Sequence, residues 1–356
     1  MKILSERQWH QMIDFGTGLF AAEPRAIGID VGTRFVKTVV LKKTRHGLAL
    51  VEFSIQAVDE QSSQHESSYA EWTKLLEKTL TVPGGIIGSS LSGPSVLIKS
   101  LSLPVMTEEE IQEHLDLELD RYIALDIQDV VWDVFSQRAG QGAEDVQQEH
   151  VLVVAKKECV AHQVKAFRRY GVNLHFVDID AFALVNLVTY SYGSEGTWLL
   201  ANIGPTGIVM VIIADGHPRY IRKVVYEAEW YGDLLDQILL PQHSIGKRKE
   251  LGASETLLLE QFLKETRRHI DEALEGFSDS ETAIIEKGLL LTGGYAVVPE
   301  MVSTLADSLR MPVRLLDPFQ SIIVSQALQE DPDFQQNAYL MSVAVGVAVR
   351  GALGHD

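Results

Sequence analysis

The chain has 356 residues, of which 46% are hydrophobic and 22% charged, so it is long enough for two domains that each bury a core. Its net charge of -18 argues against a general affinity for nucleic acid or anionic lipid. The single cysteine, Cys159, excludes an internal disulfide, and no apolar run approaches the roughly 18–20 residues of a membrane helix, so we expect a cytoplasmic protein.

The first pattern in the chain is a strand, a glycine turn and a returning strand. Residues 1–25 are expected to form an N-terminal arm, and Ala26–Val31 and Phe35–Leu41 the two strands, with Gly32 in the turn. Such a turn exposes backbone N–H groups to which a phosphate can bind, and Asp30 could hold a hydrated magnesium ion beside it. Taken alone, the pattern favours an ordinary hairpin.

The rest of the first half predicts a sheet interrupted by an insertion. Leu48–Val58 alternates as a third antiparallel strand, Tyr69–Leu80 has the spacing of a helix, and Gly84–Leu91 is strand-like. We interpret about 95–165 as a compact inserted subdomain. Its expected elements are a strand at Val96–Pro104, a helix from Thr107 to Tyr122 with Glu110 completing a capping box, a hairpin of Val130–Phe135 and His150–Ala155, and a helix at Lys156–Tyr170.

The second half repeats the opening hairpin. Within Trp198–Ala214, aligning Gly204 with Gly32 places Asn202 at the position of Asp30. Two copies of one unusual hairpin predict a duplicated fold with a phosphate between the copies. Further on, the strand Leu289–Thr292 ends in Gly293-Gly294, which suits close backbone approach to a nucleoside.

The remaining elements of the second half are mostly helical. We expect a strand at Pro218–Tyr226, helices at Leu234–Leu240, Glu255–Leu274 and Val298–Leu309, and a strand at Val313–Leu316. Tyr339–Leu353 predicts a closing helix of small residues that can pack closely on Ala181 and Ala183. A hinge between the halves and ordinary core packing explain these small residues equally well.

The ordered motifs resemble the actin-like ATPase superfamily and, within it, the PilM family of type IV pilus assembly. The matching motifs are Gly28–Lys37, Leu103-Pro104 with Thr107–Glu110, Val177–Leu184, Thr292–Pro299 and Ala344–Gly351. The resemblance spans about Ala26 to Leu353. It implies an α/β fold of two actin-like (RNase H-like) lobes, 26–195 and 196–340, with an FtsA-like inserted subdomain and a closing segment 341–356 that returns to the first lobe.

The resemblance also implies ligands and a partner. ATP would bind in the interlobe cleft with Mg²⁺ beside Asp30. Gly32 and Thr33 would line the first phosphate turn, Asn202, Gly204 and Thr206 the second, and Gly293 and Gly294 would face the adenosine. Lys37 would reach the phosphates or extend into solvent.

The implied partner is the cytoplasmic N-terminal segment of a PilN-like inner-membrane protein, bound in a groove that involves the inserted subdomain. The protein would then act in pilus (fimbrium) biogenesis and twitching motility, at the cytoplasmic face of the inner membrane through its partners. Other motor or platform proteins of the pilus are further possible partners.

Several residues depart from the superfamily pattern. Asn202 stands where an acid is usual, and Pro205 lacks the N–H that a phosphate turn would use. Tyr226–Gly232 replaces a glycine-rich step, and Gly246–Glu255 lacks a recognisable ribose-contacting motif. These departures predict weakened nucleotide binding and at most weak hydrolysis.

Two alternatives stay open. An active ATPase or small-molecule kinase would need a catalytic base, for which Asp178 and Asp180 are candidates, although both are equally suited to cap the helix that follows. A division protein of the FtsA kind, or the cytoplasmic domain of a type II secretion platform protein, is the other alternative.

Overall fold

A computed structural model describes residues 25–57, 85–93, 96–136, 147–169, 171–226, 252–278, 284–298 and 300–354. The expected N-terminal arm and the helices predicted at Tyr69–Leu80 and Leu234–Leu240 lie outside these residues, apart from Arg25.

The first sheet contains five strands in the order β3-β2-β1-β4-β8. Their bounds are Arg25–Val31 for β1, Phe35–Thr44 for β2, Gly47–Ala57 for β3, Gly85–Leu91 for β4 and Phe176–Ile179 for β8. The first three strands pair antiparallel, whereas β4 and β8 continue the sheet in parallel with β1. The predicted hairpin and third strand are therefore confirmed.

The second sheet repeats this arrangement, with five strands in the order β11-β10-β9-β12-β13. Their bounds are Thr197–Ile203 for β9, Gly207–Ala214 for β10, His217–Val225 for β11, Gly288–Thr292 for β12 and Val313–Leu315 for β13. Again a hairpin and a third antiparallel strand are followed by two parallel strands. The duplication predicted from the two hairpins is thus confirmed at the level of topology.

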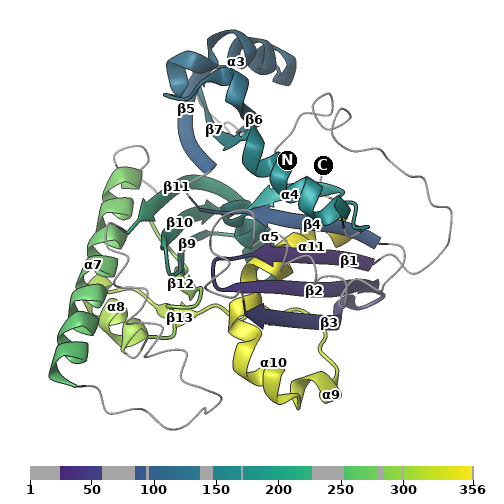
Figure 1. Cartoon of the computed structure of the whole chain (residues 1–356). Helices are drawn as coiled ribbons and strands as arrows, with labels where there is room; N and C mark the ends of the chain where they lie inside the picture. The colour runs from purple at the N-terminus through teal and green to yellow at the C-terminus, as the bar shows by residue number, and fades with distance from the viewer. Residues whose placement is uncertain are drawn as a thin grey trace.

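Two helices rich in small residues pack between the sheets, α5 (Asp180–Tyr192) and α11 (Ser342–Leu353) (Figure 1). Gly346 lies so close to α5 that an added Cβ would collide with the carbonyl oxygen of Ala183. Gly28 of β1 touches α11 in the same way, at Ala344. The predicted close packing of the closing helix on the Asp180 helix is confirmed.

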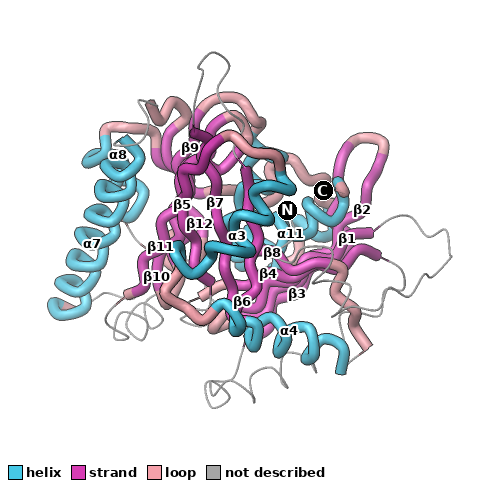
Figure 2. Tube along the Cα trace, turned by 90° about the horizontal axis from the view of Figure 1, so that it is seen from above, coloured by secondary structure: helices cyan, strands magenta, loops and turns pink. Residues whose placement is uncertain are grey.

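The outer face of the second sheet is covered by α7 (Ala253–Ser278) and α8 (Met301–Leu309) (Figures 1 and 2). Phe262, Phe277 and Met301 fill the core there. After β13 the chain returns to the first lobe, because the backbone of Ile323 bonds to Leu48 and Leu50 of β3. The short helices α9 (Gln326–Gln329), α10 (Pro332–Asn337) and η3 (Ala338–Met341) then lead into α11.

A third sheet, in the order β5-β7-β6, projects from the first lobe (Figure 1). It comprises β5 (Val96–Pro104), β6 (Val130–Ser136) and β7 (Gln147–Lys156), with α3 (Glu108–Tyr122) and the turn η2 (Ile127–Asp129) between β5 and β6. The predicted capping box is present, since Glu110 N donates to Thr107 Oγ1 and Thr107 N donates to the Glu110 carboxylate.

The third sheet has one face on α3 and the other on the first lobe. Leu152 and Val154 alternate with Val151 and Val153 along β7, the first pair packing under α3 and the second joining the first-lobe core. The next helix, α4 (Lys157–Arg169), also buries its apolar side chains in that core. The expected boundary near residue 165 therefore falls inside a helix that packs on the first lobe. No described helix is both long and apolar enough to span a bilayer.

Candidate functional site

Acidic and hydroxyl side chains line up at the carboxyl ends of the parallel strands of the first sheet. The register pairs Asp30 of β1 with Ser90 of β4, and Ser90 with Asp178 of β8. All three are buried, and Ser90 Oγ lies 3.4 Å from Asp30 Oδ1 as a hydrogen-bond donor. In open α/β sheets, ligands bind beyond this end of the strands.

Lys37 of β2 forms an ion pair with Asp30 of β1. The antiparallel register of β1 and β2 sets the two residues directly opposite each other, and Lys37 Nζ is 2.5 Å from Asp30 Oδ2. The lysine side chain is only 15% exposed. The predicted alternative in which Lys37 extends into solvent is therefore wrong.

The two glycine turns are closed by equivalent backbone hydrogen bonds. Gly32 N donates to Phe35 O at 3.0 Å, and Gly204 N donates to Gly207 O at 2.9 Å. Each glycine amide is thus used within its own turn, so a phosphate would depend on neighbouring donors such as those of Thr33 and Thr206. An added Cβ on Gly32 would sit 3.7 Å from Lys37 Nζ, which places the ammonium group beside the first turn.

At the end of β12, Gly293 meets the second hairpin. It has a φ of +95°, and an added Cβ would sit 2.5 Å from Asn202 Oδ1, so only glycine fits there. Tyr295 N also donates to Ile203 O at 3.0 Å. Gly294 is less confined, since its added Cβ would only touch Leu340 at 3.7 Å. The structure therefore brings Asn202 and Gly293 together at the ends of β9 and β12.

Asp178 is held by the closing helix. Its Oδ2 lies 2.9 Å from Arg350 Nη1, and the Arg350 guanidinium sits 4.8 Å above the centre of the Phe176 ring. Both charged side chains are almost fully buried. Asp178 does not cap α5, because the N-cap residue is Ile179. The Asp178 Oδ1 instead accepts a hydrogen bond from the N–H of Ile179.

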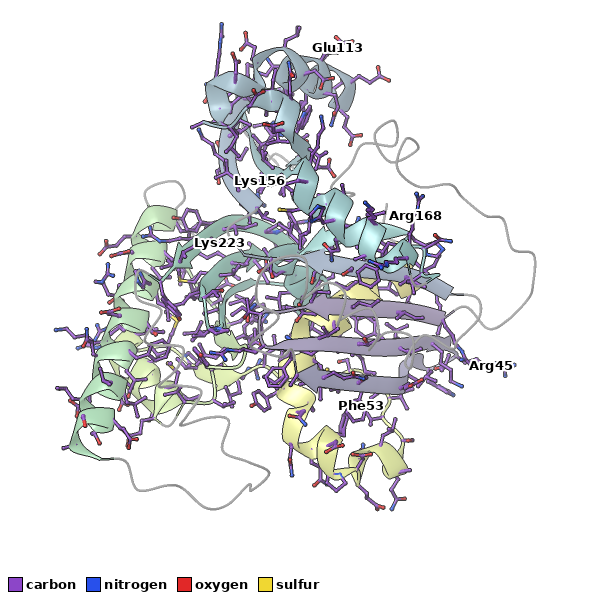
Figure 3. The ribbon with its side chains drawn as sticks, in the orientation of Figure 1. Arg45, Phe53, Glu113, Lys156, Arg168 and Lys223 are labelled. Atoms are coloured by element: carbon purple, nitrogen blue, oxygen red, sulfur yellow. The ribbon has the colours of Figure 1, made fainter. Side chains whose placement is uncertain are left out.

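Asp180 is the first residue of α5, and the positive charge of Lys223 from the second lobe acts on it. Burial raises the pKa of Asp180 to about 6, while the Lys223 ammonium opposes this shift. Burial also lowers the pKa of Lys223, whose Nζ donates to the carbonyl of Gly93 at the end of β4. Figure 3 shows Lys223 on β11, close to the base of β5. This lysine therefore ties the second lobe to the first.

The sequence did not point to Ser90, Lys223 or Arg350. Ser90 could have been found, because the predicted strand Gly84–Leu91 ends beside it. Arg350 and Lys223 contact partners that are far away in the chain, so no local pattern marks them.

The side chains present do not fit a magnesium site. One Asp30 oxygen faces Lys37 and the other faces Ser90. Among the described residues, no three Asp, Glu, His or Cys side chains converge as metal ligands. Asn202 adds no negative charge from the second hairpin. The donor set is thus poorer than the one or two free carboxylates on which magnesium relies in phosphate sites.

Comparison with known families settles the affiliation of the chain. The model of the type IV pilus assembly protein PilM family matches residues 28–352. The chain belongs to this family. The match covers both five-stranded sheets and the third sheet, so the predicted two-lobed actin-like fold with an inserted subdomain is confirmed.

One of the similar solved structures shows the same fold. A chain of the "PilM-PilN type IV pilus biogenesis complex" is 19% identical, with a TM-score of 0.73, and the match covers 93% of this chain and 99% of that one. EutJ from Carboxydothermus hydrogenoformans is 9% identical with a TM-score of 0.48, over 96% of this chain and 93% of its own. MreB5 of Spiroplasma citri bound to ADP is 11% identical with a TM-score of 0.47, over 92% and 96%.

Proposed function

We propose that this PilM-family protein is an actin-like scaffold of the type IV pilus assembly machine. It binds ATP between its lobes and the cytoplasmic N-terminal segment of a PilN-like inner-membrane protein. The observation that carries the proposal is the family match over residues 28–352, together with the similarity to a chain of a PilM-PilN complex. In this account the protein reaches the inner membrane through its partner and supports pilus biogenesis and twitching motility.

The proposed nucleotide site uses both hairpins. Gly32 and Thr33 form one phosphate turn, Gly204 and Thr206 form the other, and Lys37 supplies positive charge beside the first. The nucleoside lies at Gly293 and Gly294, next to Asn202. Equivalent turns at equivalent places in two sheets of one topology support this arrangement. Magnesium at Asp30, which the sequence predicts, does not fit this site, because the Asp30 oxygens face Lys37 and Ser90.

Hydrolysis is proposed to be weak at most. A general base must be free to take a proton, whereas Asp178 is paired with Arg350 and Asp180 is buried under the influence of the Lys223 charge. Asn202 removes one more carboxylate from the cleft. The nucleotide then acts as a structural or switching ligand, and an active kinase or ATPase is disfavoured.

The proposed partner groove lies where the third sheet meets the first lobe. Both edge strands of that sheet, β5 and β6, are next to this junction, and an edge strand can pair with an extended peptide. Phe135 of β6 packs against Phe182 of α5 and His217 of the second lobe, with ring centroids 5.9 and 6.0 Å apart. A segment bound here would contact both the inserted subdomain and the lobes.

Titration of the full chain with a labelled peptide from the cognate PilN-like N-terminus tests the partner. We expect saturable binding of the peptide, with or without ATP. A scrambled peptide should not compete for the site. Absence of binding under both conditions would contradict the scaffold proposal. An ATP turnover above a few per hour, abolished by Asp180→Asn, would instead favour the enzyme.

A further inference from the structure

Two of the three buried carboxylates at the edge of the first sheet are paired with a cation of the protein itself. Asp30 is paired with Lys37 of β2, and Asp178 is paired with Arg350 of α11. The positive charge of Lys223 on β11 acts on the third, Asp180. Asp30, which precedes the first glycine turn, is thus already compensated, and this would disfavour a divalent cation there.

The pair of Asp30 and Lys37 is built into the hairpin. Cross-strand neighbours in an antiparallel pair have side chains on one face, so the register alone brings the carboxylate and the ammonium together. Magnesium would have to displace the ammonium from the Asp30 oxygen. The displaced Lys37 ammonium, whose side chain is only 15% exposed, would then lose its carboxylate partner, and this is unfavourable.

The second hairpin offers no substitute ligand. There the residue at the position of Asp30 is the neutral Asn202, and its cross-strand partner is Val209 instead of a lysine. The phosphate site therefore has one ion pair on the first hairpin and no charge on the corresponding positions of the second.

Lys37 is placed to serve a phosphate directly. Its ammonium lies beside the Gly32 turn, as the 3.7 Å distance from an added Gly32 Cβ shows. An ammonium group has three donors, and Asp30 accepts from one of them. A lysine acts at phosphates as a compact point charge, which is the role that magnesium plays in related chemistry.

We infer that this cleft binds the phosphates of ATP without magnesium, with the Lys37 ammonium, oriented by Asp30, in place of the metal ion. The inference rests on the proposed binding of nucleotide between the lobes. It assigns Asp30 a positioning role towards Lys37 and removes it from metal binding.

The test is a calorimetric titration of the full chain with ATP, once in EDTA and once in excess magnesium chloride. The expected Kd values agree within about threefold. A Kd that is weaker by about tenfold or more in EDTA would overturn the inference while leaving the proposed nucleotide binding intact. Absence of binding in both buffers would overturn the nucleotide proposal itself, and with it this inference.

Asp30→Asn separates the two roles of the carboxylate. If Asp30 positions Lys37, the neutral amide still accepts a hydrogen bond and repels the phosphates less, so affinity stays equal or rises in both buffers. If Asp30 holds magnesium, affinity falls in the magnesium buffer alone, and this result would contradict the inference.

Lys37→Met is expected to weaken ATP binding by about tenfold or more in EDTA. Lys43→Met removes the same charge from an exposed position on the same strand and is expected to leave the affinity unchanged. The double variant Asp30→Asn/Lys37→Met avoids an unpaired buried carboxylate and must show the same loss as Lys37→Met. Undiminished affinity in that folded variant would overturn the role of Lys37.

Discussion

Asp30 and Lys37 stand directly opposite each other on β1 and β2, with the carboxylate oxygen and the ammonium nitrogen 2.5 Å apart. The pair occupies the tip of the hairpin at which the sequence predicts a phosphate turn. It gives the first lobe a neutral, preformed charge pair where the superfamily resemblance implies a carboxylate free for metal. The consequences for stability and for binding are both measurable.

Removing Lys37 alone is expected to destabilise the fold. Lys37→Met leaves the Asp30 carboxylate buried and without its cation, which costs about 3 kcal/mol of unfolding free energy. Asp30→Asn/Lys37→Met is expected to recover most of this loss, because no charge is left unpaired. Urea denaturation of the two variants beside Lys43→Met measures the difference. Equal stability of Lys37→Met and wild type would contradict the burial of the pair.

Gly346 sets the distance between the two central helices. Gly346→Ala would force its Cβ against the Ala183 carbonyl, and we expect a loss of about 2–3 kcal/mol from overpacking. Gly351→Ala is the matched control on the same helix, since its Cβ would lie 3.3 Å from side-chain carbons of Ala26 and Ile86. Thermal unfolding of both variants is the measurement, and a larger effect at Gly351 would contradict the packing described.

The two adjacent glycines after β12 should respond differently. Gly293→Ala is strained by its φ of +95° and by contact with Asn202, and we expect it to cost about 1–3 kcal/mol of stability. Gly294→Ala has room in the fold and should leave the stability nearly unchanged while weakening nucleotide binding. Calorimetry with ATP and thermal unfolding separate the two effects. Unchanged ATP affinity in Gly294→Ala would argue against the nucleoside position.

The raised pKa of Asp133 predicts that the stability of the fold depends on pH. Burial raises the pKa of this β6 carboxyl to about 7, and the nearby Asp178 adds to the shift while the Val134 N–H and Arg350 oppose it. Because the folded pKa lies above the unfolded value of about 3.9, the folded state binds the extra proton between these limits. The contribution of Asp133 is therefore fully present below about pH 4 and is lost as the pH rises through 7.

Asp133→Asn should abolish this slope. The variant is expected to be more stable than wild type by on the order of 4 kcal/mol at pH 8, and equal to it at pH 4. Denaturation curves across this range measure the effect. A gain that is independent of pH would show that Asp133 does not titrate with a raised pKa.

Much of the fold follows from local patterns in the sequence. Periodicity places both hairpins, the Thr107-capped helix and the small-residue closing helix, since each depends on neighbours within a few residues. The parallel strands β4 and β8 and the shared core between the sheets depend on contacts across the whole chain. The periodicity of the sequence does not show which face of α4 packs on the first lobe.

The site is predictable only in part for the same reason. The turns at Gly32 and Gly204 and the approach of Gly293 to Asn202 follow from glycine chemistry. The partners of the buried acids cannot be predicted from such local patterns. Lys37 is seven residues from Asp30 and only the register makes it a partner, while Arg350 reaches Asp178 and Lys223 reaches Gly93 across the fold.

Hydrogen exchange of the full chain, with ATP alone and with the PilN-like peptide alone, tests the scaffold account most directly. ATP is predicted to slow exchange at residues 31–35, 203–207 and 292–295, which form the two turns and the end of β12. The peptide is predicted to slow exchange in β5 or β6 of the third sheet. Unchanged exchange at all of these segments, at concentrations that saturate binding, would contradict the account.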